Sequence, residues 1–560
     1  MVSYTRVYEL VIYKVVAGVE RFAFKGVASN LVTYLTEVVK LSNSAAAKTV
    51  NSWCGVNFLL PLLGAFLADS FLGRYSTILV SSFIYVVGLV ALTSTAIVLE
   101  RKSATKTTSS SSSYSSLFPL LWSLFLISVA QGGYNPCLQA FGAEQLENEQ
   151  ELPSSTKDAG KGSNQKSLFF KWWYFGICSG SLLGISVMAY VQDTFGWSLG
   201  FAIPAIAMTL SVAPFYCGAR FYTVKETKGL KQIESFVKAI KASVAPNTIT
   251  RRITLSSSSS SKNSTIISDE LELEEKPLCR NEGIGIPCAE ALIVEMPDTA
   301  THHLVSDDVR AVLRLLPIWA MLLTFAVIFQ QPATFFTKQG MTMKRKIGKN
   351  FMIPPASLQS VINLSIILLM PLYDKIVIPI VQFITRSNKG IDVMQRMGIG
   401  MLLSVIAMTI AAVVEKKRLE IGSSSPLLQS PLPTIPMSIF WLLPQYIILG
   451  MSDVFTVVGM QEFFYSQVPS RLRTIGMALH LSVFGVGSFL SAFLISLLEI
   501  VTSDGEGRHS WFSNDMTEAR LDKYYWILAF SSAFSLFFFI CLCKQHKSKT
   551  DHCKVAPSTK

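Results

Sequence analysis

The chain alternates long apolar stretches with short polar segments. Eleven stretches of 18 or more residues contain no Asp, Glu, Lys or Arg, and a helix needs about 20 predominantly apolar residues to cross a bilayer. They cover 49–68, 78–99, 107–143, 172–192, 194–219, 315–337, 350–373, 397–414, 421–452, 474–498 and 524–543. Two of them open with serine- or proline-rich loops, so we expect their helices to begin near Leu117 and Met437. The pattern predicts eleven membrane-spanning helices.

A twelfth span is predicted ahead of these, in a stretch that is apolar but unusually charged. Residues 7–40 contain five charged residues, which are Glu9, Lys14, Glu20, Arg21 and Lys25. Ionisable residues inside a span usually face a cavity or a partner, so function is the default hypothesis. Lys14, Arg21 and Lys25 share one helical face, which favours an anion as ligand. In the structural alternative, Lys14 extends to the membrane interface and Arg21 pairs with Glu20.

The segment between the sixth and seventh spans differs from the other loops. Residues 223–306 hold 10 basic and 11 acidic residues together with a serine run, a composition that favours disorder. We therefore predict an N-terminal six-helix bundle at 1–222, a partly disordered cytosolic linker at 223–306, a second bundle at 307–545 and a basic cytosolic tail at 546–560. The predicted fold class is an all-α polytopic membrane protein with twelve transmembrane helices in two six-helix bundles.

Composition supports a membrane protein and argues against a nucleic-acid partner. Half of the chain is hydrophobic and 15% is charged, against about 25% in soluble proteins. The net charge of +12 is better explained by loops that face anionic lipid. An even number of spans and the basic tail place both termini in the cytosol. The basic loop at 344–349 then faces away from the cytosol, against the positive-inside rule.

Short motifs along nearly the whole chain indicate a family. Residues 64–74 read GAFLADSFLGR, in which we expect Asp69 and Arg74 to form a gate-side ion pair; solvated charges are the alternative. This segment resembles the loop signature of the major facilitator superfamily. Further motifs are ERFA at 20–23, FGAEQ at 141–145, WWYFG at 172–176, LLPIW at 315–319, IPPA at 353–356 and QEFFY at 461–465. Together they resemble the proton-dependent oligopeptide transporter family and, within it, the plant nitrate and peptide transporter family.

The resemblance implies the major facilitator fold and a mechanism. The family has a substrate cavity between its two bundles, works by alternating access and is usually coupled to protons. Asp453 stands in the tenth helix, where the family commonly has an acidic residue that contacts substrate. A buried carboxylate there is a proton-carrier hypothesis or a partner for Lys25 or Arg21, with a structural role as the alternative. Gln331 is expected either to bind a ligand or to pack between helices.

Four positions depart from the pattern of the family or of one of its branches. Ala17 stands where the family has a glutamate, and Asn135 stands where it has a lysine before a Pro-Cys pair. Losing one member of a buried ion pair strands a charge, whereas losing both is nearly neutral, so the two changes look matched. Lys25 replaces a usual aromatic residue. Phe329 stands where one nitrate-carrying branch has a histidine, so the nitrate site of that branch does not transfer to this chain.

These residues predict a carrier rather than an enzyme, because no nucleophile or metal constellation appears among the spans and no cofactor is implied. The leading hypothesis is transport of small anions, nitrate first, with Arg21 and Lys25 as anion-attracting groups, Asp453 as their acidic counterpart and weakened proton coupling. One alternative is a carrier of small peptides or another organic ion. Another is a membrane sensor signalling through the linker, where residues 251–254 resemble a kinase site at Thr254. The expected location is either the plasma membrane or the vacuolar membrane.

Overall fold

The chain forms an all-α, multi-pass membrane protein. The computed structural model describes residues 2–68, 73–104, 113–147, 159–217, 312–348, 351–372, 392–424, 434–468, 473–503 and 510–555. Within these residues, eight helices are long and apolar enough to cross a membrane. Two shorter apolar helices cover Leu316–Phe329 and Pro355–Leu369. Each of the twelve predicted stretches contains helix, and eight of them meet the length and apolarity of a span.

The helices follow one another in two groups. The first comprises α1 (Val2–Ala28), α2 (Leu31–Glu37), α3 (Asn43–Leu67), α4 (Arg74–Ala104), α5 (Ser113–Glu147), α6 (Ala159–Phe195) and α7 (Trp197–Cys217). The second comprises α10 (Leu316–Phe329), α11 (Phe335–Met341), the 3₁₀ helix η3 (Pro355–Gln359), α12 (Ser360–Leu372), α14 (Val393–Ser424), the 3₁₀ helix η6 (Ile439–Leu442), α15 (Leu443–Ser466), α16 (Arg473–Thr502) and α17 (Leu521–Val555).

Three predicted spans are interrupted, which their continuous apolar sequence did not predict. The first breaks at Ser29 and Asn30, between α1 and α2. The seventh breaks around Pro332, between α10 and α11, because proline lacks an amide hydrogen and its ring clashes with the preceding turn. The eighth becomes α-helical only at Ser360, after a strand and a 3₁₀ helix. Single uninterrupted helices at these three places were therefore a wrong prediction.

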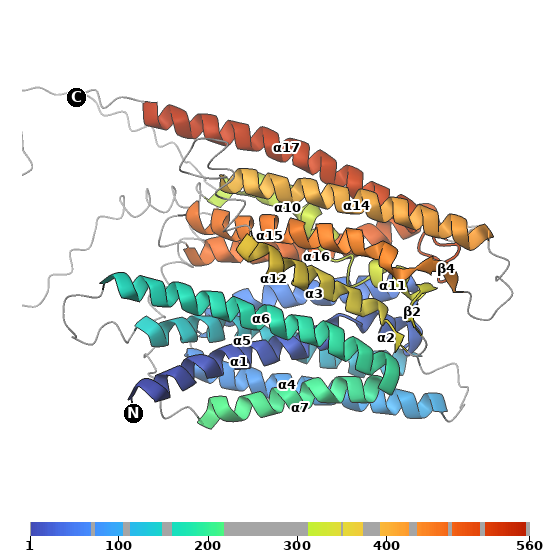
Figure 1. Cartoon of the computed structure of the whole chain (residues 1–560), viewed down its shortest axis with the longest axis horizontal. Coiled ribbons are helices and arrows are strands. Elements are labelled where there is room, and N and C mark those ends of the chain that lie inside the picture. The colour runs from blue at the N-terminus through green and yellow to red at the C-terminus, as the bar shows by residue number, and fades with distance from the viewer. Residues whose placement is uncertain are drawn as a thin grey trace, which may run out of the picture. The chain divides into compact units, whose positions relative to one another are not determined.

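Four short strands lie in the loops near α11 (Figure 1). Strand β1 (Met343–Lys344) pairs in parallel with β4 (Ile435–Ser438), and β2 (Lys346–Ile347) pairs antiparallel with β3 (Phe351–Met352). Strand β4 and η6 precede α15, so the α-helix of the tenth predicted span begins at Leu443 instead of near Met437.

Each group of helices has its own apolar core. One cluster of buried apolar side chains comes from the first group, and two more come mainly from the second. Figure 1 draws the blue-to-green helices α1, α4, α5, α6 and α7 together and the yellow-to-red helices α10 and α14 to α17 together. Helix α3 packs against both α5 and α16, so it joins the two groups.

Helix α1, which carries the unusual charges, is held against α6 at backbone distance. A Cβ atom on Gly180 would lie 2.0 Å from the carbonyl oxygen of Gly18. Only glycine at this crossing lets the two backbones approach so closely. The contact fixes the position of Ala17 to Arg21 on α1.

Large apolar side chains remain exposed on the outer faces of the helices. Phe83 on α4 is 70% exposed, Phe118 on α5 is 73% exposed and Ile500 on α16 is 74% exposed. Exposure of this kind would be costly in water but is expected where helices face lipid tails.

Several predicted features lie outside the described residues. They are Asp69 of the proposed gate pair, the linker at 223–306 with Thr254, and the last residues of the tail. Arg74 is described and begins α4. The side chain of Lys14 is also outside the described part, although its backbone belongs to α1.

Candidate functional site

The carboxylate of Glu20 is the centre of a buried polar network between α1, α4 and α5. Glu20 is 1% exposed. Its Oε2 lies 2.9 Å from Nε of Arg21, and its Oε1 accepts a hydrogen bond of 2.5 Å from Nε2 of Gln131. The Tyr85 hydroxyl donates a longer bond of 3.4 Å to the same Oε1. Both carboxylate oxygens therefore have partners, as a buried charge requires.

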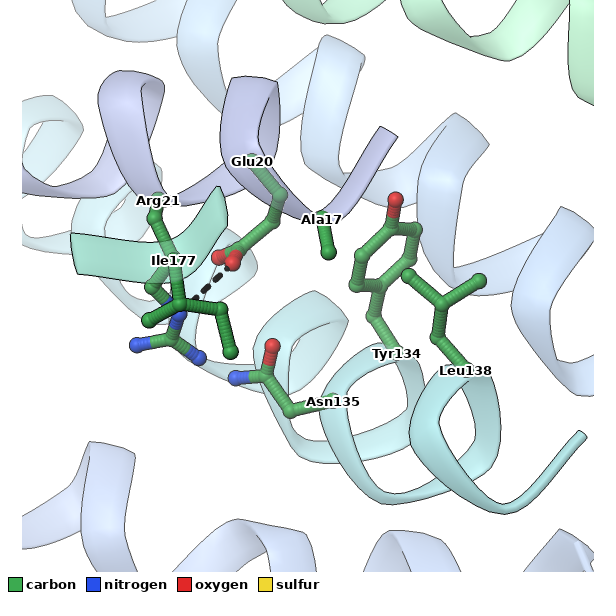
Figure 2. A pocket seen from close by; sticks show the side chains of 7 residues that line it. All are labelled: Ala17, Glu20, Arg21, Tyr134, Asn135, Leu138 and Ile177. Atoms are coloured by element: carbon green, nitrogen blue, oxygen red, sulfur yellow. Dashed lines mark ion pairs between the residues drawn. The ribbon is translucent and has the colours of Figure 1, made fainter. Parts of the chain in front are cut away.

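Arg21 is held through one nitrogen only. Its Nε faces Glu20, while the rest of the guanidinium extends away from that carboxylate in Figure 2. Among the described residues, neither Nη nitrogen has a hydrogen-bond partner, and the side chain is 24% exposed. The guanidinium also lies 5.9 Å from the ring of Phe24. Arg21 thus keeps unused donors beside a satisfied carboxylate.

A cavity of about 70 Å³ adjoins these donors. Its lining residues, drawn in Figure 2, are Ala17, Glu20, Arg21, Tyr134, Asn135, Leu138 and Ile177. A single water needs roughly 10–15 Å³ by this measure, whereas pockets for drug-sized ligands are roughly 300–1,000 Å³. The cavity is therefore sized for a few waters or one small polyatomic solute.

The cavity lies where the chain departs from the family pattern. Ala17 on α1 and Asn135 on α5 both line it, and the amide of Asn135 lies on the side of the Arg21 guanidinium in Figure 2. A glutamate at 17 and a lysine at 135 would project into this space. Their shared replacement by shorter side chains leaves room beside Arg21.

A second charged pair faces the interior without direct contact. Asp453 on α15 is 7% exposed, and its Oδ1 has no hydrogen-bond partner among the described residues. The charge that acts on Asp453 is the Lys25 ammonium, which also interacts electrostatically with Arg21 and Glu20. No ion pair within 4.0 Å joins Lys25 to a carboxylate in the described part. The two groups attract one another across a gap.

Comparison with known proteins decides the family. Residues 75–512 match the family described as PTR2: POT family. The chain belongs to the POT family. It is 54% identical to Protein NRT1/ PTR FAMILY 5.9 of Arabidopsis thaliana, over 96% of this chain and 95% of that protein. It is 42% identical to Protein NRT1/ PTR FAMILY 5.10 of the same plant, over 95% and 91%.

A solved structure agrees on the fold of this POT family chain. The crystal structure of the POT family transporter PepTSo superposes with a TM-score of 0.66 at 19% identity, covering 97% of this chain and 98% of that one. At this identity the likeness concerns the fold alone. The chain is thus a transporter with the major facilitator fold and not an enzyme, and the expected resemblance is confirmed.

Four predicted site residues of this POT family chain do not line the cavity: Lys25, Asp453, Gln331 and Phe329. Gln331 is fully buried, and its Nε2 donates to Tyr524 of α17 and to a backbone carbonyl of α10, while its Oε1 has no hydrogen-bond partner among the described residues. Phe329 contacts Phe484 edge to face at 5.1 Å, and Phe484 stacks on Phe58 of α3 at 5.3 Å. Phe329 therefore belongs to an aromatic cluster where α3 meets the second group.

Sequence reasoning missed the residues that support Glu20. Gln131, Tyr85 and Tyr134 surround it, and the Tyr134 hydroxyl is buried without a hydrogen-bond partner among the described residues. A glutamine inside an apolar span was the available signal, because polar groups in a span need partners. Gln131 lies four residues before Asn135, so both side chains are on one face of α5.

The two halves of the transporter are joined by polar contacts at one end. Lys48 on α3 pairs with Glu499 on α16 at 2.7 Å, and Ser44 donates to the same carboxylate at 2.6 Å. Asp193 at the end of α6 lies 3.4 Å from Arg345. These contacts lie away from the end where α1 begins and α17 ends (Figure 1).

A buried lysine adds to the contacts at this end. Lys338 on α11 is 7% exposed and donates to the Thr36 hydroxyl of α2 at 3.0 Å. The Glu37 carboxylate also interacts electrostatically with Lys338. Lys338 therefore joins α11 of the second group to α2 of the first.

Proposed function

We propose that the protein carries small inorganic anions, nitrate first, and that Arg21 binds them in the cavity beside Asn135. Two observations carry the proposal: Arg21 lines a cavity of about 70 Å³, and its Nη nitrogens have no hydrogen-bond partner among the described residues. A guanidinium presents planar, forked donors that match planar oxyanions, and such charge-assisted bonds are among the strongest.

In the proposed site the substrate anion occupies the place of the carboxylate that position 17 lacks. The family's glutamate at position 17 would put an anionic group beside Arg21, and Ala17 removes it. The shorter, neutral Asn135 leaves space for the substrate beside Arg21. The anion then enters a site whose charge is balanced by neighbours that belong to the chain, so its desolvation is compensated.

Alternating access would follow from the contacts between the halves. In this proposal the ion pairs of Lys48 with Glu499 and of Asp193 with Arg345 hold the two halves together at the end away from the termini and separate when that end opens. Asp453 and Lys25 lie on opposite halves and attract each other more strongly as the gap between them narrows. Asp69 and Arg74 remain our proposal for the gate at the cytosolic end.

A second candidate substrate is a small peptide or another zwitterion. The unpartnered Oδ1 of Asp453 favours it, because this oxygen can accept from an ammonium while Arg21 binds a carboxylate. The cavity volume of about 70 Å³ argues against a peptide in the described state.

Uptake into proteoliposomes tests both candidates. Purified protein is reconstituted at a clamped membrane potential, and isotope-labelled nitrate and a labelled dipeptide are offered separately. Nitrate uptake that falls at least tenfold in Arg21→Gln but persists in Arg520→Gln, an exposed arginine paired with Asp522, supports the proposal if both variants reach a normal protein level. Dipeptide uptake without nitrate uptake would replace it with the second candidate.

A further inference from the structure

The contact between Glu20 and Arg21 has an unusual single-point geometry. An arginine beside a carboxylate commonly makes two parallel hydrogen bonds, using Nε and one Nη. Here the closest approach is between Nε and Oε2, at 2.9 Å, and no hydrogen bond from an Nη nitrogen to Glu20 is found among the described residues. Something must hold Oε1 away from the guanidinium, because an unconstrained carboxylate would gain by turning toward it.

Gln131 occupies that oxygen. It reaches Oε1 of Glu20 from α5 at 2.5 Å and is itself 2% exposed. The Tyr85 hydroxyl on α4 supplies a second and longer bond to the same atom. With Oε1 committed to these donors, only Oε2 remains for Arg21, and both Nη nitrogens stay available to the cavity.

Gln131 is an uncharged donor to the Glu20 carboxylate. The charged groups that act on Glu20 are Arg21 and Lys25, both on α1. Helices α4 and α5 contribute only the uncharged Tyr85, Gln131 and Tyr134 in the described part of the chain. Gln131 therefore satisfies the carboxylate with an uncharged donor, and Arg21 remains the cation that lines the cavity.

We infer that Gln131 is a positioning residue for anion binding, which keeps Glu20 in single-point contact with Arg21 and so leaves the two Nη donors free for the substrate. The inference rests on the proposed function and deepens it. Without the Gln131 donor, Glu20 would turn toward Arg21 and form the two-point contact. One Nη would then be lost to the substrate, while helix packing would be preserved.

The test compares two buried glutamines. Gln131→Met removes the donor while keeping an unbranched side chain of similar length. Gln192→Met is the matched control, because Gln192 is also 2% exposed and donates from α6 to α1, at the carbonyl of Gly26, away from Glu20. In proteoliposomes, we expect Gln131→Met to raise the KM for nitrate about tenfold, which is about 1.4 kcal/mol, with kcat changed less than twofold. Gln192→Met should leave KM unchanged.

A double-mutant cycle separates positioning from packing. In a Glu20→Gln background, Gln131→Met should cause no further rise in KM, since no carboxylate is left to hold; a packing role would add in both backgrounds. Tyr85→Phe, which removes the longer bond, should raise KM in the same direction but by less. If Gln131→Met fails to fold, Tyr85→Phe tests the inference instead. Nitrate-induced thermal stabilisation of the detergent-purified protein then gives a second measure of nitrate binding.

The outcomes are distinguishable. Normal nitrate uptake by the wild type with an unchanged KM in Gln131→Met and Tyr85→Phe overturns the inference alone. Equal KM changes in Gln131→Met and Gln192→Met also overturn it. A wild type that takes up no nitrate overturns the proposed function, and this inference with it.

Discussion

Restoring the missing carboxylate at position 17 should block the proposed anion site from within. Ala17 is 3% exposed and lines the same cavity as Arg21. In Ala17→Glu, the new carboxylate enters that cavity and pairs with the free Nη donors of Arg21. The substrate then has to displace an ion pair that belongs to the chain before it can bind.

The magnitude follows from the donors that are lost. A hydrogen bond to a charged group contributes about 1.5–3 kcal/mol, and each 1.4 kcal/mol is about tenfold in affinity. Occupation of the Arg21 donors should therefore raise the KM for nitrate by about 10- to 150-fold. A new buried carboxyl group that exchanges a proton should also make uptake depend on the pH gradient, which we expect to be shallow in the wild type.

The assay is nitrate uptake by proteoliposomes at clamped potential, with and without a pH gradient. Ala17→Gln is the matched control, because it fills the same volume without a charge and should raise KM far less. Adding Asn135→Lys to Ala17→Glu supplies a competing cation for the carboxylate, and it should recover part of the affinity and keep the new pH dependence. A wild-type KM in Ala17→Glu at normal protein level would show that Arg21 does not bind the substrate in this cavity.

Three further predictions concern the charges around the cavity and the contacts between the halves. Wild-type uptake should follow the nitrate gradient and the membrane potential, and any proton-driven accumulation should vanish in Asp453→Asn; steep proton-driven accumulation in the wild type contradicts weak coupling. Lys25→Ala should lower nitrate affinity severalfold and Lys14→Ala hardly at all, measured as KM at equal protein level; equal effects contradict the cationic-face idea. Lys48→Met removes the ion pair with Glu499, so a cysteine introduced at position 44 should react faster with a thiol reagent added on the non-cytosolic side. Unchanged labelling would show that this ion pair does not help to close that side.

Much of the fold could be predicted from the chain because each span is a local property. A run of about 20 apolar residues must satisfy its backbone as a helix wherever it crosses the bilayer. All twelve predicted stretches contain helix for that reason, and the family resemblance held over most of the chain. The breaks at Ser29 and near Pro332 were missed because apolar composition does not report where a helix ends inside a buried segment.

The candidate site was predicted in part. Glu20, Arg21, Ala17 and Asn135 were identified from charge inside a span and from departures in a motif, and the structure places all four at one cavity. Gln331 carried an equally polar signal, yet it donates to Tyr524 near the start of α17. Polarity inside a span indicates that a partner exists, but it does not say whether the partner is a ligand or another helix.

The sequence by itself determined which segments are helical, which family they belong to and which ionisable groups sit within the spans, because these follow from local composition and short motifs. Only the tertiary structure decided that Gln131, more than a hundred residues away, reaches Oε1 of Glu20, and that Arg21 lines a cavity with Nη donors that no other described residue uses. Hydrogen bonds depend on atomic positions set by the packing of α1 against α4, α5 and α6, and those positions are properties of the assembled helices.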